Sequence, residues 1–428
     1  MPSFHRDPAR LYIALRIATA FVMATAFTTS AIYRINLGEL SPLQLVLVGT
    51  VLELSVFLFE VPTGVLADTY SRRLSMIIGF AIIGVGLVVE GSIATFETIL
   101  LAQVIWALGY TFTSGATEAW LMDEAGEAAG ENALLRSAQF APLGALTGIA
   151  LGAGLAAMSL RLPYFIGGAG MFCVAAALFL TMRETNFHPA PSTERNTFRR
   201  GFETFTAGLG VVRGRTVLLL LMAISIGQGL WSEAFDRLWE LQFLEQWEFP
   251  FAADFDPVLW FGAINIAGLL LGIGVIEVMR RIIRGRDATV LAASLAITTA
   301  AMAVGLAAFA LAGSFALGVG AYLTVRIIYR METPLTYAWL NRGLESRVRA
   351  TVLSMHGQMN AIGQVGGGPI VGLIGSLAGV RWALFVSAII LIPVTALYGL
   401  AVRATAREVA SNRALTAEGA PESEREPV

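Results

Sequence analysis

The chain has 428 residues, of which 56% are hydrophobic and 14% are charged, and its mean hydropathy is +0.69. Soluble globular domains carry about 25% charged residues, so this composition excludes a soluble domain and indicates a polytopic membrane protein. The formal net charge of −2 gives no indication of a nucleic-acid partner.

Apolar runs long enough to cross a bilayer, about 20 residues each, recur along the whole chain. The first follows Arg6 and Arg10 and is longer than the apolar core of a signal peptide, so we expect an uncleaved first span. The predicted spans are 11–33, 42–66, 74–95, 98–121, 134–158, 161–182, 215–241, 257–281, 288–311, 314–340, 350–375 and 380–402. The sequence therefore predicts an all-α protein with twelve transmembrane helices.

A polar, proline- and arginine-containing stretch at 183–214 divides the twelve spans into two groups of six. We therefore expect an N-terminal half over 1–182, a cytoplasmic linker over 183–214 and a C-terminal half over 215–402. Residues 403–428 have little apolar content, which predicts a disordered cytoplasmic tail.

Arginines are distributed unevenly between the two sides of the predicted membrane. Twenty-two of the 29 basic residues, all arginines, fall in the termini and loops on the N-terminal side, and only Arg34, Arg161 and Arg381 fall in loops on the other side. Because cytoplasmic loops carry an excess of basic residues, we expect both termini in the cytoplasm and a multi-pass protein of the cell membrane.

The loop between the second and third spans carries a short charged motif. Its residues are Gly64, Asp68, Arg72 and Arg73, spaced Gly-x-x-x-Asp-x-x-x-Arg-Arg. Gly64 permits a close helix approach, and Asp68, one helical turn further on, can cap a helix or pair with an arginine. The motif resembles the loop between helices 2 and 3 of major facilitator superfamily transporters. Thr69 and Ser71 depart from that family's usual Arg and Gly.

The second half repeats features of the first. Residues 117–148 align without gaps on 336–367, and the identities fall on Trp, Gln and spaced Gly rather than on common apolar residues. Glu277 and Arg281 repeat the spacing of Asp68 and Arg72. Two halves of the same topology are the parallel repeat of this superfamily. The resemblance covers about 10–402 and implies two six-helix halves that rock around a central substrate site.

Charged residues inside the spans are candidates for the substrate and proton pathway, since each costs about 2.5–3.5 kcal/mol at the centre of a membrane helix. Glu53 and Arg326 lie near mid-membrane in opposite halves, and Glu53 could carry a proton. The alternative is that each is tied to a local partner and only holds helices together.

The seventh span contributes Gln228, Glu233 and Arg237 to this pathway. Glu233 and Arg237 are spaced i, i+4 and can pair along the helix. The segment is a candidate for substrate contact and gating near the outer mouth. The alternative is an interfacial helix end with tryptophans in the aromatic belt.

Glu118, His356 and Gln364 complete the predicted pathway. Glu118 lies near the cytoplasmic end of the fourth span and could form an inner ion-pair gate with Arg16, whereas the alternative is a charge that snorkels to the interface. His356 and Gln364 add polarity to the eleventh span, although a lone histidine is more often structural.

Cysteine and histidine are too few for a metal centre. Cys173 is the single cysteine, and the three histidines are scattered, so we expect no thiolate, zinc or haem site. The lysine-containing loop that binds ATP phosphates is missing, so we expect no cofactor and no ATP hydrolysis within the chain.

The resemblance implies a secondary transporter, acting as a monomer in the lipid bilayer on a small-molecule substrate. We expect proton-coupled efflux of small amphiphilic compounds by alternating access, with protons as the coupling ion. An uptake symporter of the same fold is one alternative. A membrane-embedded transferase is the other, and it would need clustered Asp or His at a membrane face.

Overall fold

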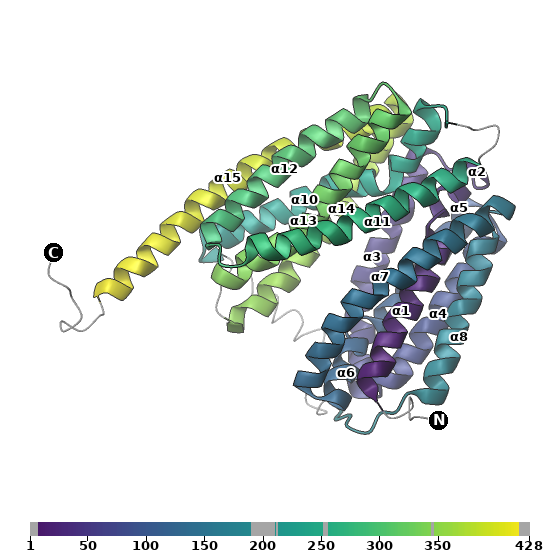
Figure 1. The fold of residues 1–428 in the computed structure, drawn as a ribbon, viewed down its shortest axis with the longest axis horizontal. Helices are drawn as coiled ribbons and strands as arrows, with labels where there is room; N and C mark the ends of the chain where they lie inside the picture. The colour runs from purple at the N-terminus through teal and green to yellow at the C-terminus, as the bar shows by residue number, and fades with distance from the viewer. Residues whose placement is uncertain (1–6, 190–209, 211–212, 251–255, 344–345, 419–428) are drawn as a thin grey trace.

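The structure, a computed structural model, describes residues 7–189, 210, 213–250, 256–343 and 346–418, and these form a bundle of long α-helices (Figure 1). The first half contains six spans, two of which are each built from a pair of helices. Their bounds are α1 (Pro8–Phe27) with α2 (Ser30–Asn36), α3 (Pro42–Thr69), α4 (Arg72–Ser92), α5 (Phe96–Thr113) with α6 (Ala116–Ala125), α7 (Glu127–Met158) and α8 (Leu162–Thr181).

The second half contains six further spans. Their bounds are α10 (Thr216–Gln246), α11 (Pro257–Ile283), α12 (Ala288–Leu311), α13 (Phe315–Gly343), α14 (Ser346–Ala378) and α15 (Val380–Glu418). Eleven of the twelve described segments are long and apolar enough to cross a membrane. The remaining one, α13, carries Arg326, Arg330 and Glu332, which lower its hydropathy. The predicted fold class, twelve helices in two halves, is confirmed.

Glycines bring the same helices together in both halves. Gly144 and Gly148 of α7 lie directly against the backbone carbonyls of Ile17 and Phe21 in α1, where any added Cβ would overlap the carbonyl oxygen. In the second half, Gly363 of α14 lies in the same way against the backbone of α10. Gly144 and Gly363 are paired in the sequence alignment of the repeat. Small residues at such spacing let backbones approach closely in membranes.

The two halves touch at one face of the membrane and diverge towards the other, where both termini lie (Figure 1). We call these the closed face and the open face. Between the halves, α3 packs against α10 and α14, and α7 packs against α11. At the closed face the backbone N–H of Leu43 donates to Ser376 Oγ at 3.0 Å. Gly372 of α14 approaches the same residue of α3.

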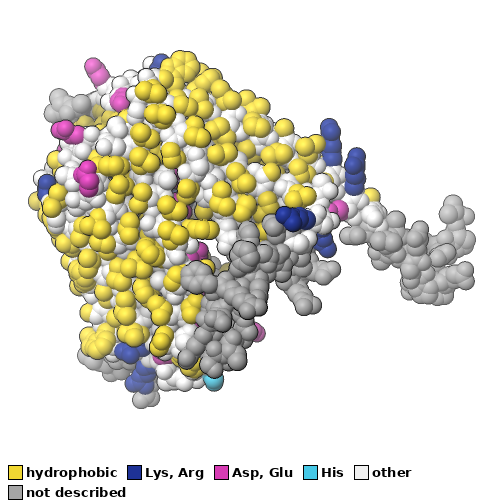
Figure 2. Space-filling view, turned by 180° about the vertical axis from the view of Figure 1, so that it is seen from behind, with side chains coloured by type: hydrophobic (Ala, Val, Ile, Leu, Met, Phe, Trp, Pro, Cys, Tyr) yellow, Lys and Arg dark blue, Asp and Glu magenta, His cyan; other side chains and the backbone are white. Residues whose placement is uncertain are grey.

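The outer surface is suited to lipid. Figure 2 shows hydrophobic side chains covering most of this view, with charged side chains mainly towards the ends of the molecule. Leu180 and Leu377 are each 80% exposed, and Met158 is 79% exposed. So many large apolar side chains exposed together indicate a surface that faces the hydrocarbon of a membrane.

Three sequence expectations differ from the structure or lie outside it. Arg34, predicted in a loop, lies in the short helix α2 and is buried. The tail predicted to be disordered from 403 is helical up to Glu418, because this alanine- and arginine-rich stretch contains good helix formers. Most of the predicted linker, residues 190–209 and 211–212, and the last residues, 419–428, lie outside the described residues.

Candidate functional site

Each half contains a cavity at membrane depth. The cavity in the first half has a volume of about 400 Å³ and is lined mainly by α1, α4, α5 and α6. The cavity in the second half has a volume of about 450 Å³ and is lined by α13 and α14. Cavities of this size hold small organic molecules.

The cavity in the first half is lined by apolar and polar side chains in similar number. Leu15, Met23, Phe80, Ile83 and Met171 are its large apolar side chains. This apolar lining would accept the hydrocarbon part of a ligand.

Polar groups of the same cavity gather where the fourth span is interrupted. The break between α5 and α6 falls at Ser114 and Gly115, and Gly115 has a φ of +70°, which only glycine adopts freely. Irregular backbone at membrane depth is tolerated where it lines a cavity. Glu118 lies here as predicted, together with Arg16, and Glu118 Oε1 accepts a hydrogen bond from the Tyr12 hydroxyl at 3.3 Å. Their predicted role as an ion-pair gate stays a prediction.

The cavity in the second half is lined mainly by polar and charged side chains. Arg326 lies in this lining as predicted, and its Nη1 contacts Asp236 Oδ1 of α10 at 2.9 Å. Arg330 and Glu332 extend the charged lining along α13. His356 of α14 also lines it.

The polar residues of α14 are tied to α10 rather than free in the cavity. His356 Nδ1 is hydrogen-bonded to Ser225 Oγ. Gln364 Nε2 donates to Asn360 Oδ1 at 2.9 Å, and Asn360 Nδ2 donates to the Ser225 carbonyl at 3.4 Å. His356 and Asn360 line the cavity, whereas Gln364 is not among the lining residues.

Gln228 lies behind the cavity wall. It is 1% exposed, and its Oε1 accepts a hydrogen bond from Trp231 Nε1. The sequence placed Gln228 in contact with substrate, but in this conformation the side chain does not line the cavity. The helix there is hidden by close packing, since Gly229 presses against the backbone of Asn360.

Glu53, Glu233 and Arg237 meet at the contact between the halves. Arg237 Nε contacts Glu233 Oε1 at 2.9 Å, so the i, i+4 pair predicted from spacing is present. The pair lies directly against Gly49 of α3, where an added Cβ would overlap both side chains. Glu53, one turn further along α3, is half-buried, and the nearest charges that act on it are those of Glu233 and Arg237. Glu53 therefore faces α10, while Arg326 pairs separately with Asp236.

A buried ion pair near the closed face was missed by sequence reasoning. Arg34 Nη2 contacts Glu90 Oε1 at 2.7 Å, and the residues are 4% and 2% exposed. Gln103 Nε2 donates to Glu90 Oε2 at 2.8 Å, and the Tyr164 hydroxyl donates to Glu90 Oε1 at 2.9 Å. A glutamate inside an apolar run was the available signal, but its partner lies 56 residues away in the chain.

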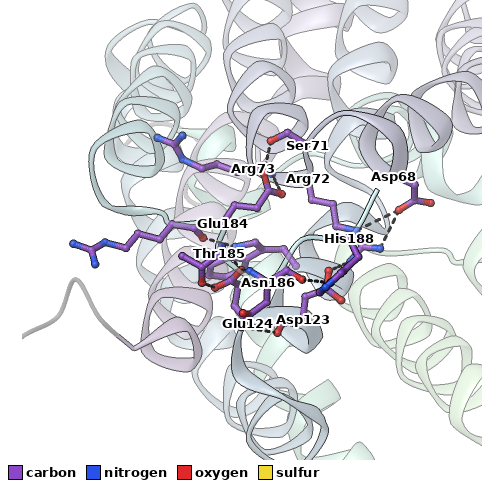
Figure 3. A network of polar contacts seen from close by, with 12 residues as sticks. Asp68, Ser71, Arg72, Arg73, Asp123, Glu124, Glu184, Thr185, Asn186 and His188 are labelled. Atoms are coloured by element: carbon purple, nitrogen blue, oxygen red, sulfur yellow. Dashed lines mark hydrogen bonds and ion pairs between the residues drawn. The ribbon is translucent and has the colours of Figure 1, made fainter. Parts of the chain in front are cut away.

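The charged motif after α3 forms a network within the first half (Figure 3). Arg72 contacts Asp68 Oδ1 at 3.2 Å, as its spacing predicts, and it also pairs with Asp123 at the end of α6. The guanidinium of Arg73 donates to the carbonyl of Phe179 at 2.7 Å. The motif therefore ties α3 and α4 to α6 and α8 at the open face.

The chain after α8 is held by two carboxylates of this network (Figure 3). Glu184 accepts hydrogen bonds from Ser71 Oγ and from the backbone N–H of Arg73, which fixes the start of α4. Glu124 accepts from the backbone N–H groups of Thr185 and Asn186 at 2.6 and 2.7 Å. The acidic last turn of α6 thus holds the beginning of the predicted linker.

Two other members of the predicted gate motif make simpler contacts. An added Cβ at Gly64 would meet no atom within 4 Å, so the close helix approach expected there is not made in this conformation. Glu277 contacts Arg281 at 3.4 Å and Arg280 at 3.3 Å on the exposed end of α11. The second copy of the motif is therefore a local surface ion pair here.

Comparison with known proteins identifies the family. The family model described as Major Facilitator Superfamily matches residues 12–365, which is most of the chain. The chain belongs to the major facilitator superfamily. This membership makes it a transporter of small molecules that spans the membrane many times, not an enzyme such as a membrane-embedded transferase.

Relatives support the same family and fold. The uncharacterized MFS-type transporter YxaM of Bacillus subtilis (strain 168) is 23% identical over 394 residues, covering 87% of this chain and 94% of YxaM. A mutant form of the nucleoside transporter NupG has a TM-score of 0.76 at 13% identity, covering 92% of this chain and 100% of that one.

Two further solved structures share the superfamily fold. A bacterial homologue of the human lysosomal transporter Spinster, inward-facing and unoccupied, has a TM-score of 0.72 at 16% identity, covering 95% of this chain and 99% of that one. A POT family transporter in complex with 5-aminolevulinic acid has a TM-score of 0.73 at 12% identity, covering 93% and 96%. At these identities the likeness concerns the fold alone.

Proposed function

We propose that this superfamily member is a proton-coupled secondary transporter that exports small amphiphilic compounds by alternating access. The observation that carries the proposal is the contrast between the two cavities. The first contains several large apolar side chains such as Phe80 and Met171, whereas the second is lined almost entirely by charged and polar side chains such as Arg330 and Glu332. A ligand with an apolar body and a polar head group matches both linings.

Alternating access follows from how the halves meet. They are in contact at the closed face, through Leu43 and Ser376, and diverge towards the open face (Figure 1). Rocking of two repeats around a central site is the mechanism of such folds. Opening the closed face would separate Gly49 of α3 from the Glu233–Arg237 pair.

The arginine distribution supports an open face in the cytoplasm of a cell membrane, with both termini inside. Arg72 and Arg73 at the start of α4 lie at this face, as do Arg403 and Arg407 in the last part of α15. An exporter loads its substrate from the cytoplasm, and the conformation described here is the loading state under that orientation. We propose that the transporter works as a monomer, because each chain holds both halves and both cavities.

Protons are the proposed driving ion because acidic side chains, Glu53 and Glu332, lie at membrane depth at or near the path between the halves. Glu53 would exchange its proton as the contact with α10 opens and closes. The chain contains no ATP-binding loop that would offer a different energy source.

The test is proton flux in proteoliposomes that contain a pH-sensitive dye, with a panel of cationic, anionic and neutral amphiphiles. Wild-type protein should dissipate an imposed pH gradient when a transported compound is added on the cytoplasmic side. Accumulation against the reverse gradient would instead identify an uptake symporter. If no panel compound moves protons in either orientation, the proposal of proton-coupled amphiphile transport is wrong.

Glu53→Gln tests the role of that residue within the same assay. Loss of dye response with retained exchange of compound would support proton carriage by Glu53. An unchanged response would remove Glu53 from the proton pathway.

A further inference from the structure

Three of the buried side-chain polar atoms that have no hydrogen-bond partner among the described residues lie near one another in the second half. They are Gln228 Nε2 of α10, Thr336 Oγ1 of α13 and the Tyr398 hydroxyl of α15. The exposed fractions of these residues are 1%, 2% and 0%. Buried polar atoms are nearly always hydrogen-bonded, so each such exception needs an explanation.

The three atoms gather around one place. Gln228 and Thr336 are the polar side chains nearest the Tyr398 hydroxyl, and Glu332 is the charge that acts on it. Glu332 lies one helical turn before Thr336, so both project from the same face of α13. Glu332 and Thr336 also line the cavity of the second half. Glu332 therefore lies beside both the cavity and these buried polar atoms, which we call the Tyr398 cluster.

Glu332 has no ion-pair partner among the described residues, although arginines are close to it in sequence. Arg326 is paired with Asp236, and Arg330 lies against Gly272 of α11. His356, the titratable side chain that α14 brings to this cavity, is hydrogen-bonded to Ser225. Tyr329 and Tyr337 of α13 are the other titratable groups that line this cavity.

An unpaired carboxylate within a membrane is far more costly as an anion than as a neutral acid. The neutral acid also has an O–H group that can donate a hydrogen bond. The Thr336 and Tyr398 hydroxyl oxygens can accept such a bond, directly or through an ordered water. Protonated Glu332 can therefore form hydrogen bonds with the cluster, whereas its anion has no arginine as an ion-pair partner among the described residues.

We propose that Glu332, supported by the Tyr398 cluster, is a binding site of the transported coupling proton in addition to Glu53. This inference rests on the proposed proton coupling. In the open conformation a hydronium ion from the cavity transfers its proton to a carboxylate oxygen of Glu332 and leaves a water molecule. In the alternate conformation the acid returns that proton to water on the other side. No covalent bond other than O–H is made or broken.

The chemistry of the cluster favours a proton over a sodium ion. Trp231 Nε1 can only donate, and it donates to Gln228 Oε1, which turns the Nε2 amide hydrogens into the cluster. Amide hydrogens repel a metal cation, which prefers a shell of oxygen atoms. A protonated carboxyl group, with both an O–H donor and a carbonyl acceptor, matches a site that contains both hydroxyls and amide hydrogens.

The experiment compares wild type, Glu332→Gln and the control Glu97→Gln, which removes an exposed carboxylate at the start of α5. Purified proteins are titrated with acid while infrared difference spectra record the carbonyl stretch of protonated carboxylic acids. In proteoliposomes, the panel compound that moves in wild type is followed both under a pH gradient and as exchange without a gradient.

We expect Glu332→Gln to lose one carboxylic-acid signal and all gradient-driven movement, while it retains exchange. Glu97→Gln should behave as wild type under a pH gradient. Gradient-driven movement that persists in Glu332→Gln would overturn the inference, as would wild-type movement driven by sodium alone. If the wild-type protein shows the Glu332 signal but no proton-driven movement, the proposed function is wrong, whereas Glu332 is still a site that takes up a proton.

A second variant, Tyr398→Phe, covers the case in which Glu332→Gln does not fold. It keeps the ring and the carboxylate but removes one hydroxyl from the cluster. The pH at which the Glu332 signal and the gradient-driven movement reach half their range should shift in this variant. An unchanged pH dependence would show that the Tyr398 cluster does not act on a transported proton.

Discussion

Replacing Glu90 by Gln tests whether the buried ion pair of the first half holds the closed face together. Arg34 and Glu90 are almost fully buried, and α2, which carries Arg34, contacts α10. Glu90→Gln keeps the shape of the side chain and one acceptor oxygen, but it leaves the Arg34 cation without an anion.

Removing one partner of a buried pair costs about 3–5 kcal/mol, because the remaining charge is desolvated without compensation. Arg34 has few other groups to turn to, since Gln103 and Tyr164 already donate to the same carboxylate. An exposed pair is worth about 0–1 kcal/mol. Glu277→Gln is the matched control, because its partner Arg281 is 79% exposed.

Equilibrium unfolding of the purified proteins in mixed detergent micelles measures these free energies. Glu90→Gln should lose about 3–5 kcal/mol of unfolding free energy and Glu277→Gln at most about 1 kcal/mol. The double variant Arg34→Met with Glu90→Gln removes both charges and should recover part of the loss. Equal losses for Glu90→Gln and Glu277→Gln would refute the reasoning.

Two further predictions concern the movement of the halves. Gly49→Ala places a Cβ where the Glu233 carboxylate lies, so it should shift the protein away from the conformation that is open to the termini. Spin labels at the two ends of the bundle would measure this shift, and Gly64→Ala, which meets open space, should leave the distances unchanged. Asp68→Asn should leave folding intact and slow transport in the proteoliposome assay, because Arg72 loses one of its two carboxylates. Unchanged transport would remove Asp68 from the gate.

The spans could be read from the sequence because each depends on a local property. A run of apolar residues fixes where a helix crosses the membrane, and the predicted and observed bounds of α12 coincide at 288–311. The Glu233–Arg237 pair was also readable, since i, i+4 spacing lies within one helix. The breaks in the first and fourth spans could not be predicted, because small residues such as Ser114 and Gly115 also occur within continuous membrane helices.

Ion-pair partners that lie on different helices could not be predicted from the sequence. Arg34 looked like a loop residue because the glutamate that compensates its charge is on α4, and nothing in either local sequence indicates the other. Arg326 and Glu53 were both placed near mid-membrane by depth alone, whereas the structure pairs Arg326 with Asp236 of α10. The position of a residue along a span predicts its depth in the membrane, but it does not predict towards which neighbouring helix the side chain points.

Glu90 and Glu332 show why the role of a charged residue within a span cannot be predicted from the sequence alone. Both are glutamates inside long helices, and both were passed over in the sequence. Glu90 accepts hydrogen bonds from an arginine, a glutamine and a tyrosine, so its negative charge is compensated within the first half. Glu332 has an exposed route to the cavity and only neutral neighbours behind it. Compensation by neighbours from other helices therefore separates a carboxylate that holds the fold from one that can carry a proton.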